Sequence, residues 1–321
     1  MAESTHFYKS FLSAIRFKIT NKATLVNAIT DLLAIDKDAV YRRLRGEVNF
    51  SFSEMAIIAR SMGISLDSIA GIENFQSKPA KLNISKQVNP EEMDYEMFEG
   101  HVDLLKSIMH ESDTVIMEAG NILPHYLYSE YEYLSRFYQF IWNRSSGYGP
   151  SLPFHEIVVP QRLRNLQVET CRYARHIKST QYVWDSMIFQ RLVTDIKFYV
   201  KIDFIKEEDV YKIKQDLMSF LENIENLTIK GKFEDTGNEI SIYIVDTNCD
   251  TNYSCLTSNN IQMTLFKVFL LNAIVCLDES IYDEALAWIR SLQRMSTLIS
   301  VSGEKARATF FSTQRNIINT I

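Results

Sequence analysis

The sequence contains little glycine and little proline. Ten glycines and six prolines among 321 residues make up about 5% of the chain, against an average usage near 12%. This low content disfavours glycine-rich phosphate-binding folds and β-sandwiches with many turns, and it favours helices joined by short connections. Hydrophobic residues reach 46% and charged residues 23%, which is the composition of a globular protein and not of a disordered chain.

The chain also lacks the patterns of a disulfide framework, a signal peptide or a membrane span. Its four cysteines, Cys171, Cys249, Cys255 and Cys276, never show the two-residue spacing of a redox or zinc motif. The N-terminus has neither the basic nor the apolar region of a signal peptide. The apolar stretch 261–277 is interrupted by polar side chains and is shorter than the run of about 20 apolar residues that a spanning helix needs. We therefore expect a cytoplasmic protein without a membrane segment.

Motifs for catalysis and metal binding are missing as well. The sequence has no glycine-rich phosphate loop, no His-Glu-x-x-His and no Gly-x-Ser-x-Gly. Its histidines are never three or four positions apart, so no two of them can bind a metal from one face of a helix. We therefore predict no catalytic residue, no metal site and no cofactor. An enzyme without a recognisable motif is the third alternative, after the two described below.

Charge is distributed unevenly along the chain. The whole sequence carries a net charge of −6, whereas the first 75 residues contain nine basic and eight acidic side chains, for a net charge of +1. Three of these cations, Arg42, Arg43 and Arg45, fall within four positions. Because an acidic body repels DNA, any DNA binding must be concentrated on one face of the N-terminal part.

Residues 1–74 show the pattern of five short helices. Three of them are expected at 4–19, 22–34 and 37–45, a fourth between a capping box at Ser51–Glu54 and Gly63, and a fifth after Ser65. We expect one small helical domain over 1–74, followed by a linker over 75–90, where the helical periodicity fades.

Residues 91–321 predict a larger domain of the α+β class. Alternation and β-branched residues indicate a strand at 239–246, and further strands are expected at 114–117, at 253–257 and in two parts of 261–277. The other segments are mostly helical and include one long aromatic helix over 124–144. The expected fold is therefore mainly α, with a small antiparallel sheet in the second domain.

The most specific feature is a pair of the expected helices. Segments 22–34 and 37–45 are joined by a turn of about three residues, as in a helix-turn-helix. In the second helix, Val40 and Leu44 share a face because they are four positions apart. The opposite face is polar and rich in cations, with Lys37, Asp38, Tyr41, Arg42 and Arg45. A helix that enters the major groove of DNA requires one apolar and one polar side.

Residues 20–70 resemble the DNA-binding domain of the lambda-repressor-like (Cro/CI-type) transcription regulators. The resemblance rests on Val-Tyr-Arg-Arg-Leu-Arg-Gly-Glu at 40–47 and on Phe-Ser-Glu-Met-Ala-Ile-Ile-Ala-Arg-Ser-Met-Gly-Ile-Ser at 52–65. In that family the matching helix enters the major groove, and the loop after its glycine grips phosphate. The acidic start of this helix at 36–38 departs from the Ser or Thr and Gln with which many members begin it.

The resemblance implies roles for individual residues. It implies contacts with base edges for Lys37, Asp38, Tyr41 and Arg42. It implies contacts with the phosphate backbone for Arg43, Arg45, Asn49 and Ser51. Asp38 either accepts a hydrogen bond from cytosine N4 or strengthens the N-terminus of its helix. The alternative to all of these contacts is an arginine cluster on a solvated helical face.

The second domain is expected to sense an effector, because DNA reading is complete by residue 70. Aromatic residues of the segment 124–144 are candidates for lining a ligand pocket, namely Tyr126, Tyr131, Phe137 and Trp142, and the alternative is that they form ordinary core. We therefore expect a sequence-specific transcription regulator that binds double-stranded DNA as a homodimer, with an unknown small molecule or protein as effector. The second alternative is an adaptor that binds a protein or peptide and not DNA.

Overall fold

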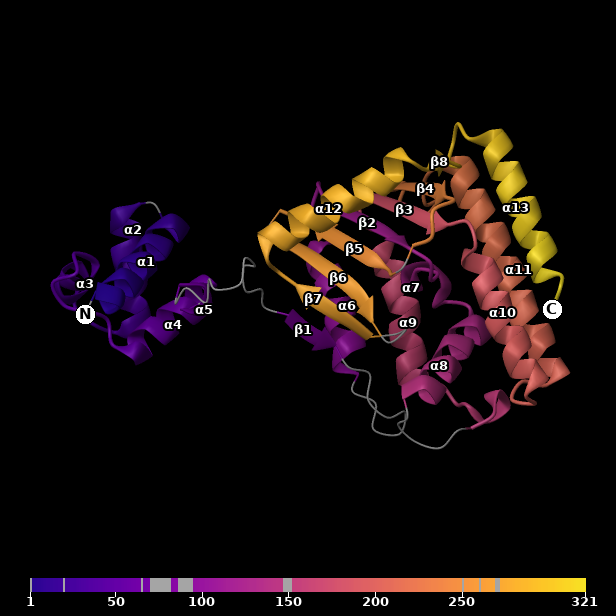
Figure 1. Cartoon of the computed structure of the whole chain (residues 1–321), viewed down its shortest axis with the longest axis horizontal. Coiled ribbons are helices and arrows are strands. Elements are labelled where there is room, and N and C mark those ends of the chain that lie inside the picture. The colour runs from indigo at the N-terminus through magenta and orange to yellow at the C-terminus, as the bar shows by residue number, and fades with distance from the viewer. Residues whose placement is uncertain are drawn as a thin grey trace. The chain divides into compact units, whose positions relative to one another are not determined.

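The computed structural model describes residues 2–19, 21–64, 66–69, 82–85, 95–146, 152–249, 251–259, 261–268 and 272–321 (Figure 1). The chain divides into two compact units, Met1–Pro79 and Ala80–Ile321, which we call the N-terminal unit and the C-terminal unit. The described residues are mainly helical and contain one mixed β-sheet. None of the helices described is long and apolar enough to cross a membrane.

The N-terminal unit is built from helices packed around one core. The helices are α1 (Ala2–Lys18), α2 (Lys22–Leu33), α3 (Lys37–Leu44), α4 (Phe52–Met62) and α5 (Leu66–Ile69). Their apolar faces meet at buried side chains that include Phe11, Ile15, Ile29, Val40 and Ile58. Burial of these side chains holds the short helices together, because a helix of two turns is not stable alone.

Several helix ends of this unit agree with the local signals in the sequence. Asn21 accepts hydrogen bonds from the backbone of Ala23 and Thr24 at the start of α2, at 3.0 Å each. The capping box of α4 is present. Gly46 and Gly63 have positive φ angles of 78° and 63°, as expected for glycines that end helices.

The C-terminal unit contains helices on both faces of a sheet. Its elements are β1 (Leu82–Ser85), α6 (Glu96–Ile108), β2 (Val115–Gly120), α7 (His125–Tyr128), α8 (Glu132–Ser146), a 3-10 turn (Phe154–Glu156), α9 (Gln161–Ala174), β3 (Ser179–Asp185), α10 (Ile188–Lys201), α11 (Glu207–Lys230), β4 (Glu239–Val245), β5 (Tyr253–Thr257), β6 (Gln262–Val268), β7 (Asn272–Cys276), α12 (Glu279–Arg294), β8 (Thr297–Leu298) and α13 (Glu304–Ile318). The strand order is β1-β7-β6-β5-β2-β3-β4-β8.

The expected antiparallel sheet is wrong in one respect, because three neighbouring strands, β2, β3 and β4, run parallel. β3 pairs in parallel with both β2 and β4, while the remaining pairs are antiparallel. The helices α7–α9 and α10–α11 return the chain to the same end of the sheet, which is what parallel pairing requires. The sequence did not predict β3, whose residues Tyr182, Val183 and Trp184 are all buried, as is typical of a strand covered on both faces.

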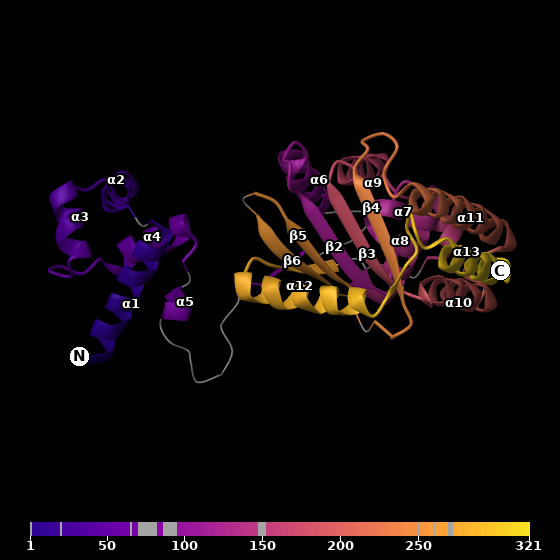
Figure 2. The same cartoon turned by 90° about the horizontal axis from the view of Figure 1, so that it is seen from above.

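The two faces of the sheet are covered by different helices. Figure 2 shows α12 along one face and α6, α9 and α11 along the other. On the first face, Met117 and Cys255 pack with Tyr282 and Ile289 of α12. On the second face, Ile116 packs in a cluster with side chains of α6 and α9. The strands β3 and β4 contribute to the large core with α8, α10, α11 and α13.

Two further expectations differ from the structure. Within the segment 75–90, which was expected to be a linker, the structure describes residues 82–85. These residues form the strand β1, which pairs antiparallel with β7, and Leu82 lies opposite Cys276. The expected continuous helix over 124–144 is wrong, because α7 and α8 are separate helices. Asp216 of α11 explains the second difference, since its carboxylate accepts hydrogen bonds from the backbone of Tyr133 and Leu134 at 2.6 and 3.1 Å and caps the start of α8.

Candidate functional sites: the surface of α3 and a buried cavity

The helix α3 has one buried and one exposed side. Val40 and Leu44 are 0% and 5% exposed and belong to the core of the N-terminal unit. Lys37, Asp38 and Arg42 are exposed on the other side. Tyr41 is partly buried, and its ring centre lies 5.7 Å from the Lys22 ammonium. The predicted turn between α2 and α3 is formed by residues 34–36.

A small network of opposite charges lies at the C-terminal end of α3. The Nε atom of Arg45 is 2.6 Å from Oε1 of Glu47, and the Nε atom of Arg42 is 3.7 Å from Oε2 of the same carboxylate. About half of each of these three side chains is exposed. The hydrogen bond from Arg45 lowers the pKa of Glu47. Both arginines therefore remain at the surface, where solvent weakens their contacts with Glu47.

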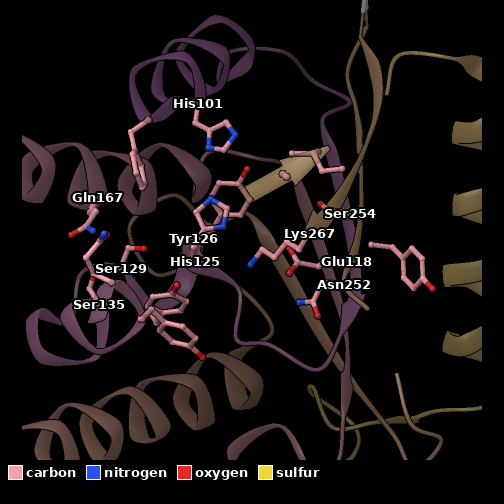
Figure 3. A pocket seen from close by; sticks show the side chains of 17 residues that line it. His101, Glu118, His125, Tyr126, Ser129, Ser135, Gln167, Asn252, Ser254 and Lys267 are labelled. Carbon is pink, nitrogen blue, oxygen red and sulfur yellow. The ribbon is translucent and has the colours of Figure 1, made fainter. Parts of the chain in front are cut away.

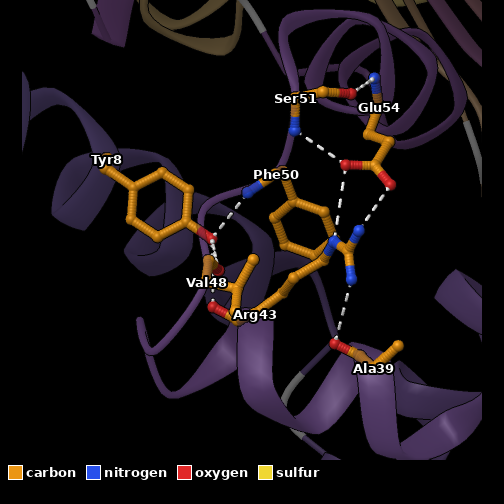
Figure 4. A network of polar contacts seen from close by, with 7 residues as sticks. All are labelled: Tyr8, Ala39, Arg43, Val48, Phe50, Ser51 and Glu54. Carbon is orange, nitrogen blue, oxygen red and sulfur yellow. Dashed lines mark hydrogen bonds and ion pairs between the residues drawn. The ribbon is translucent and has the colours of Figure 1, made fainter.

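Arg43 occupies a different environment from Arg42 and Arg45. Its Nη2 atom donates to Oε1 of Glu54 at 3.0 Å, and its Nη1 atom donates to the carbonyl of Ala39 at 3.4 Å (Figure 4). Glu54 also accepts from the backbone of Ser51, while the Ser51 hydroxyl accepts from the backbone of Glu54. The Arg43 side chain is therefore held by contacts within the protein, whereas Ser51 is exposed and its hydroxyl only accepts a hydrogen bond here. Asn49 is exposed.

The helix α1 holds the loop that follows α3. The Tyr8 hydroxyl accepts a hydrogen bond from the backbone of Phe50 at 3.1 Å and donates to the carbonyl of Arg43 at 3.0 Å. Arg16 donates from Nη2 to the carbonyl of Leu44 at 2.7 Å. Sequence reasoning did not find these contacts, because the partners lie 28 to 42 positions apart and no local pattern connects them.

The C-terminal unit contains a cavity between one face of the sheet and the helices α6, α7, α8 and α9 (Figure 3). Its polar lining includes His101 from α6, Glu118 from β2, His125 and Tyr126 from α7, Asn252 before β5 and Lys267 from β6. Aromatic side chains form much of the remaining wall. The centre of a water-sized molecule can occupy about 60 Å³ of this cavity, which is enough for several water molecules or a small ligand.

Burial shifts the pKa of four side chains that line this cavity, His101, His125, Glu118 and Lys267. It lowers the pKa of His101 to about 4 and lowers that of His125 well below its usual value, and the nearby Lys267 adds to both shifts. It raises the pKa of Glu118 and lowers that of Lys267, and the opposite charge of each partner counteracts the shift. Burial therefore disfavours the charged form of all four groups.

Three of these groups have a buried atom without a hydrogen-bond partner among the described residues. The atoms are Nδ1 of His101, Oε1 of Glu118 and Nε2 of His125. Glu118 is 3% exposed. Buried polar atoms in native proteins are nearly always paired, so three unpaired atoms around one cavity indicate a place where something else binds.

The loop between β2 and α7 is held by Asn252. Its Oδ1 atom accepts from the backbone of Asn121 and Ile122 at 3.0 and 3.3 Å, and its Nδ2 atom donates to the carbonyl of Ile122 at 3.0 Å. Gly120 makes this possible, because a Cβ atom at that position would lie 2.2 Å from Cγ of Asn252. The same loop leads into α7 and so positions His125 beside the cavity.

The structure separates the four aromatic residues that were predicted to line a pocket. Tyr126 lines the cavity. Tyr131 packs edge-on against Phe220, with ring centres 5.5 Å apart. Phe137 and Trp142 are 0% and 2% exposed and are buried in the interior, so for these two the alternative of ordinary core applies. Sequence reasoning missed Glu118 and Lys267. Each is a charged residue within a mostly apolar strand, and this pattern could have indicated a buried functional side chain.

No family model, curated protein or solved structure matches this chain. In the part of the chain that the structure describes, no group of three or more His, Cys, Asp or Glu side chains is arranged to hold a metal ion. Function is therefore inferred from the surface of α3 and from the cavity.

Proposed function

We propose that this protein is a sequence-specific, DNA-binding transcription regulator that inserts α3 into the major groove. The observation that carries the proposal is the two-sided environment of α3. Its apolar side is buried against the core, and its exposed side presents Lys37, Asp38 and Arg42 directly after a three-residue turn. An α-helix with side chains is about 10–12 Å wide, which fits the major groove of B-DNA, about 12 Å wide.

The roles of individual residues follow from their environments. Lys37, Asp38, Tyr41 and Arg42 contact base edges, and Arg45, Asn49 and Ser51 contact phosphates. The guanidinium of Arg42 suits guanine, which offers two acceptors in the major groove. Arg43 is a positioning residue in this proposal, because it ties α3 to the start of α4 through Glu54. Glu47 must release Arg42 and Arg45 before they reach DNA.

The regulator acts as a homodimer in this proposal. One unit with a single recognition helix contacts few base pairs, and a second copy on a half-site about one helical turn away supplies the missing affinity. The C-terminal unit senses an effector and sets the oligomeric state. The sequence outside the first 75 residues carries most of the negative charge. The C-terminal unit therefore repels DNA, and only the N-terminal unit contacts it.

Selection of bound fragments from a genomic DNA library tests the proposal. Full-length protein is used at two salt concentrations, and we expect enrichment of a palindrome with half-sites about one turn apart. Arg42→Ala should then lower specific binding by about 1–3 kcal/mol if it reads a guanine. Arg45→Ala should weaken binding to all sequences alike and reduce the salt slope by about one. Arg60→Ala, an exposed arginine on α4, is the matched control.

An adaptor that binds a protein or peptide is the second candidate. It rests on two apolar side chains exposed on α4, Phe52 and Ile57, which are 75% and 45% exposed. Absence of any enrichment at low salt would favour this function over DNA binding. Phosphate contacts make DNA affinity fall steeply with salt, whereas apolar docking on α4 should depend little on it.

A further inference from the structure

The cavity of the C-terminal unit has the features of an unfilled binding site. Glu118 is almost completely buried and has an unpaired oxygen. His101 and His125 each present an unpaired ring nitrogen, and their rings lie 5.7 Å apart between centres. Figure 3 shows Lys267 and Glu118 extending from the sheet toward the side of His125 and Tyr126. A cavity that served packing alone would be lined by apolar groups and would leave no polar atom unpaired.

The strand register places opposite charges on the same face of the sheet. Glu118 of β2 lies opposite Ser254 of β5, which lies opposite Leu265 of β6. Lys267 is two positions beyond Leu265 and therefore points to the same side. One strand separates β2 from β6, so their backbones are about 10 Å apart. The carboxyl group and the ammonium group thus approach the cavity from two separate strands.

Glu118 and Lys267 therefore reach the same cavity with opposite charges. The attraction between Glu118 and Lys267 counteracts part of the effect of burial on each, but among the described residues the two side chains form no direct ion pair. A buried charge is stable when an opposite charge pairs with it. A ligand with one charge could pair with one of these groups and would leave the other without a partner.

We propose that the cavity binds a small zwitterion of the α-amino acid class, with the ammonium toward Glu118 and the carboxylate toward Lys267. The neutral imidazoles of His101 and His125 can each donate an N–H to the same carboxylate. The limited free volume selects a small amino acid, and the aromatic wall accepts its side chain. Its role as the effector of a regulator rests on the proposed function, whereas the binding itself does not.

Binding is tested with full-length protein in the absence of DNA. Common α-amino acids are added singly at millimolar concentrations and followed by thermal unfolding and by calorimetric titration. Propionate and isopropylamine are the matched probes for L-alanine, because each keeps one of its two charged groups. We expect at least one small amino acid to raise the unfolding temperature. It should also bind at least about tenfold more tightly than the two analogues that keep only its ammonium or only its carboxylate, because a buried charge left unpaired weakens binding strongly.

Two substitutions test the assignment of the charges. Glu118→Gln and Lys267→Met remove one charge each with little change in size, and each should weaken binding of that amino acid by at least about tenfold. Glu284→Gln and Lys305→Met change exposed residues of α12 and α13 and should leave binding unchanged. If a cavity variant fails to fold, the comparison of zwitterion and single-charge analogue on the unaltered protein still decides.

Three results would overturn the inference: no common α-amino acid binds, a single-charge analogue binds as tightly as the zwitterion, or folded Glu118→Gln protein binds as well as the parent. The first result excludes a common α-amino acid as the ligand of this cavity. DNA binding is measured on the same preparation. DNA binding without amino acid binding rejects the ligand assignment alone, and amino acid binding without DNA binding rejects the proposed function alone.

Discussion

Three arginines within four positions of the chain have different surroundings. Arg42 and Arg45 are about 60% and 56% exposed, whereas the Arg43 side chain is 21% exposed and bonded to Glu54. Position on α3 explains the difference, because Arg43 lies on the side that faces the start of α4. The residue types therefore indicated the positive charge of this segment. How much of each arginine side chain is exposed depends on the residues that pack beside it.

At Gly120, the absence of a side chain is required by a neighbour that is distant in sequence. Gly120→Ala places a methyl group 2.2 Å from Cγ of Asn252, so either the loop after β2 or Asn252 must move. We expect the free energy of unfolding of the C-terminal unit to fall by about 1–3 kcal/mol, the usual effect of overpacking. Urea denaturation followed by circular dichroism measures this loss.

Gly100→Ala is the matched control for this substitution. Gly100 lies within α6, where a Cβ atom meets nothing within 4 Å. Alanine is favoured over glycine inside a helix by about 1 kcal/mol, so this variant should be as stable as the parent or more stable. Equal destabilisation by both substitutions would show that the close approach of Asn252 to Gly120 is unimportant.

The buried histidines make stability depend on pH. The pKa of His101 falls from 6.5 in the unfolded chain to about 4 in the folded protein, so the unfolded state takes up a proton first as the pH decreases. The free energy of unfolding is therefore highest above about pH 6.5 and declines toward pH 4, by at most about 1.4 kcal/mol per pH unit for this residue. The shift of His125 acts in the same direction. The lowered pKa of Lys267 also acts in the same direction as the histidines, whereas the raised pKa of Glu118 acts in the opposite direction.

Denaturation in urea at pH 7 and pH 5 tests the contribution of His101. His101→Phe removes the titrating ring, and the variant should lose less stability between these two pH values than the parent protein does. His110→Phe, which changes an exposed histidine just after α6, should retain the parent's pH dependence. An unchanged pH dependence in His101→Phe protein would contradict the burial of a neutral imidazole at this site.

At the scale of elements, α1 and α11 determine where other elements begin and end. Asp216 of α11 caps α8 and so divides the aromatic segment into two helices. Tyr8 and Arg16 of α1 bind the end of α3 and its following loop. In both places a side chain from a distant helix satisfies backbone groups that a local sequence pattern leaves open.

Tyr8→Phe tests the hold of α1 on the loop after α3. The substitution removes the hydroxyl that accepts from the buried backbone N–H of Phe50, and an unpaired buried donor costs about 1–3 kcal/mol. We expect a loss of this size in the stability of the N-terminal unit and faster hydrogen exchange at the Phe50 amide. Tyr211→Phe, at a residue 63% exposed on α11, is the control. If exchange at Phe50 is unchanged, the hydroxyl does not hold the loop.

At the scale of the whole molecule, the proposed function requires two copies of the chain. The monomer mass is 37.3 kDa, and we expect sedimentation of the full-length protein to give about twice this mass. The two recognition helices should then select half-sites about 10–10.5 base pairs apart between centres. A protein that stays monomeric at micromolar concentration, both alone and on a selected DNA site, would exclude the dimeric regulator.

Most helices of the chain were predictable, but β3 and the parallel pairing around it were not. Capping residues, glycines and periodicity are local, so the ends of α2 and α4 could be located from the sequence. β3 carries no alternation because both of its faces are covered, and its parallel pairing depends on helices before and after it. The cavity groups come from α6, β2, α7 and β6, and no spacing in the sequence connects them.

The sequence by itself therefore determined the helical character, the two-part organisation and the apolar and polar sides of α3. These properties depend on interactions between residues a few positions apart, which composition and periodicity record directly. Only the tertiary structure decided which arginines are exposed, that β2, β3 and β4 run parallel, and that Glu118 and Lys267 face one cavity. These properties depend on burial and on contacts across the chain, where the electrostatic and packing environment of a residue is created by partners far away in sequence.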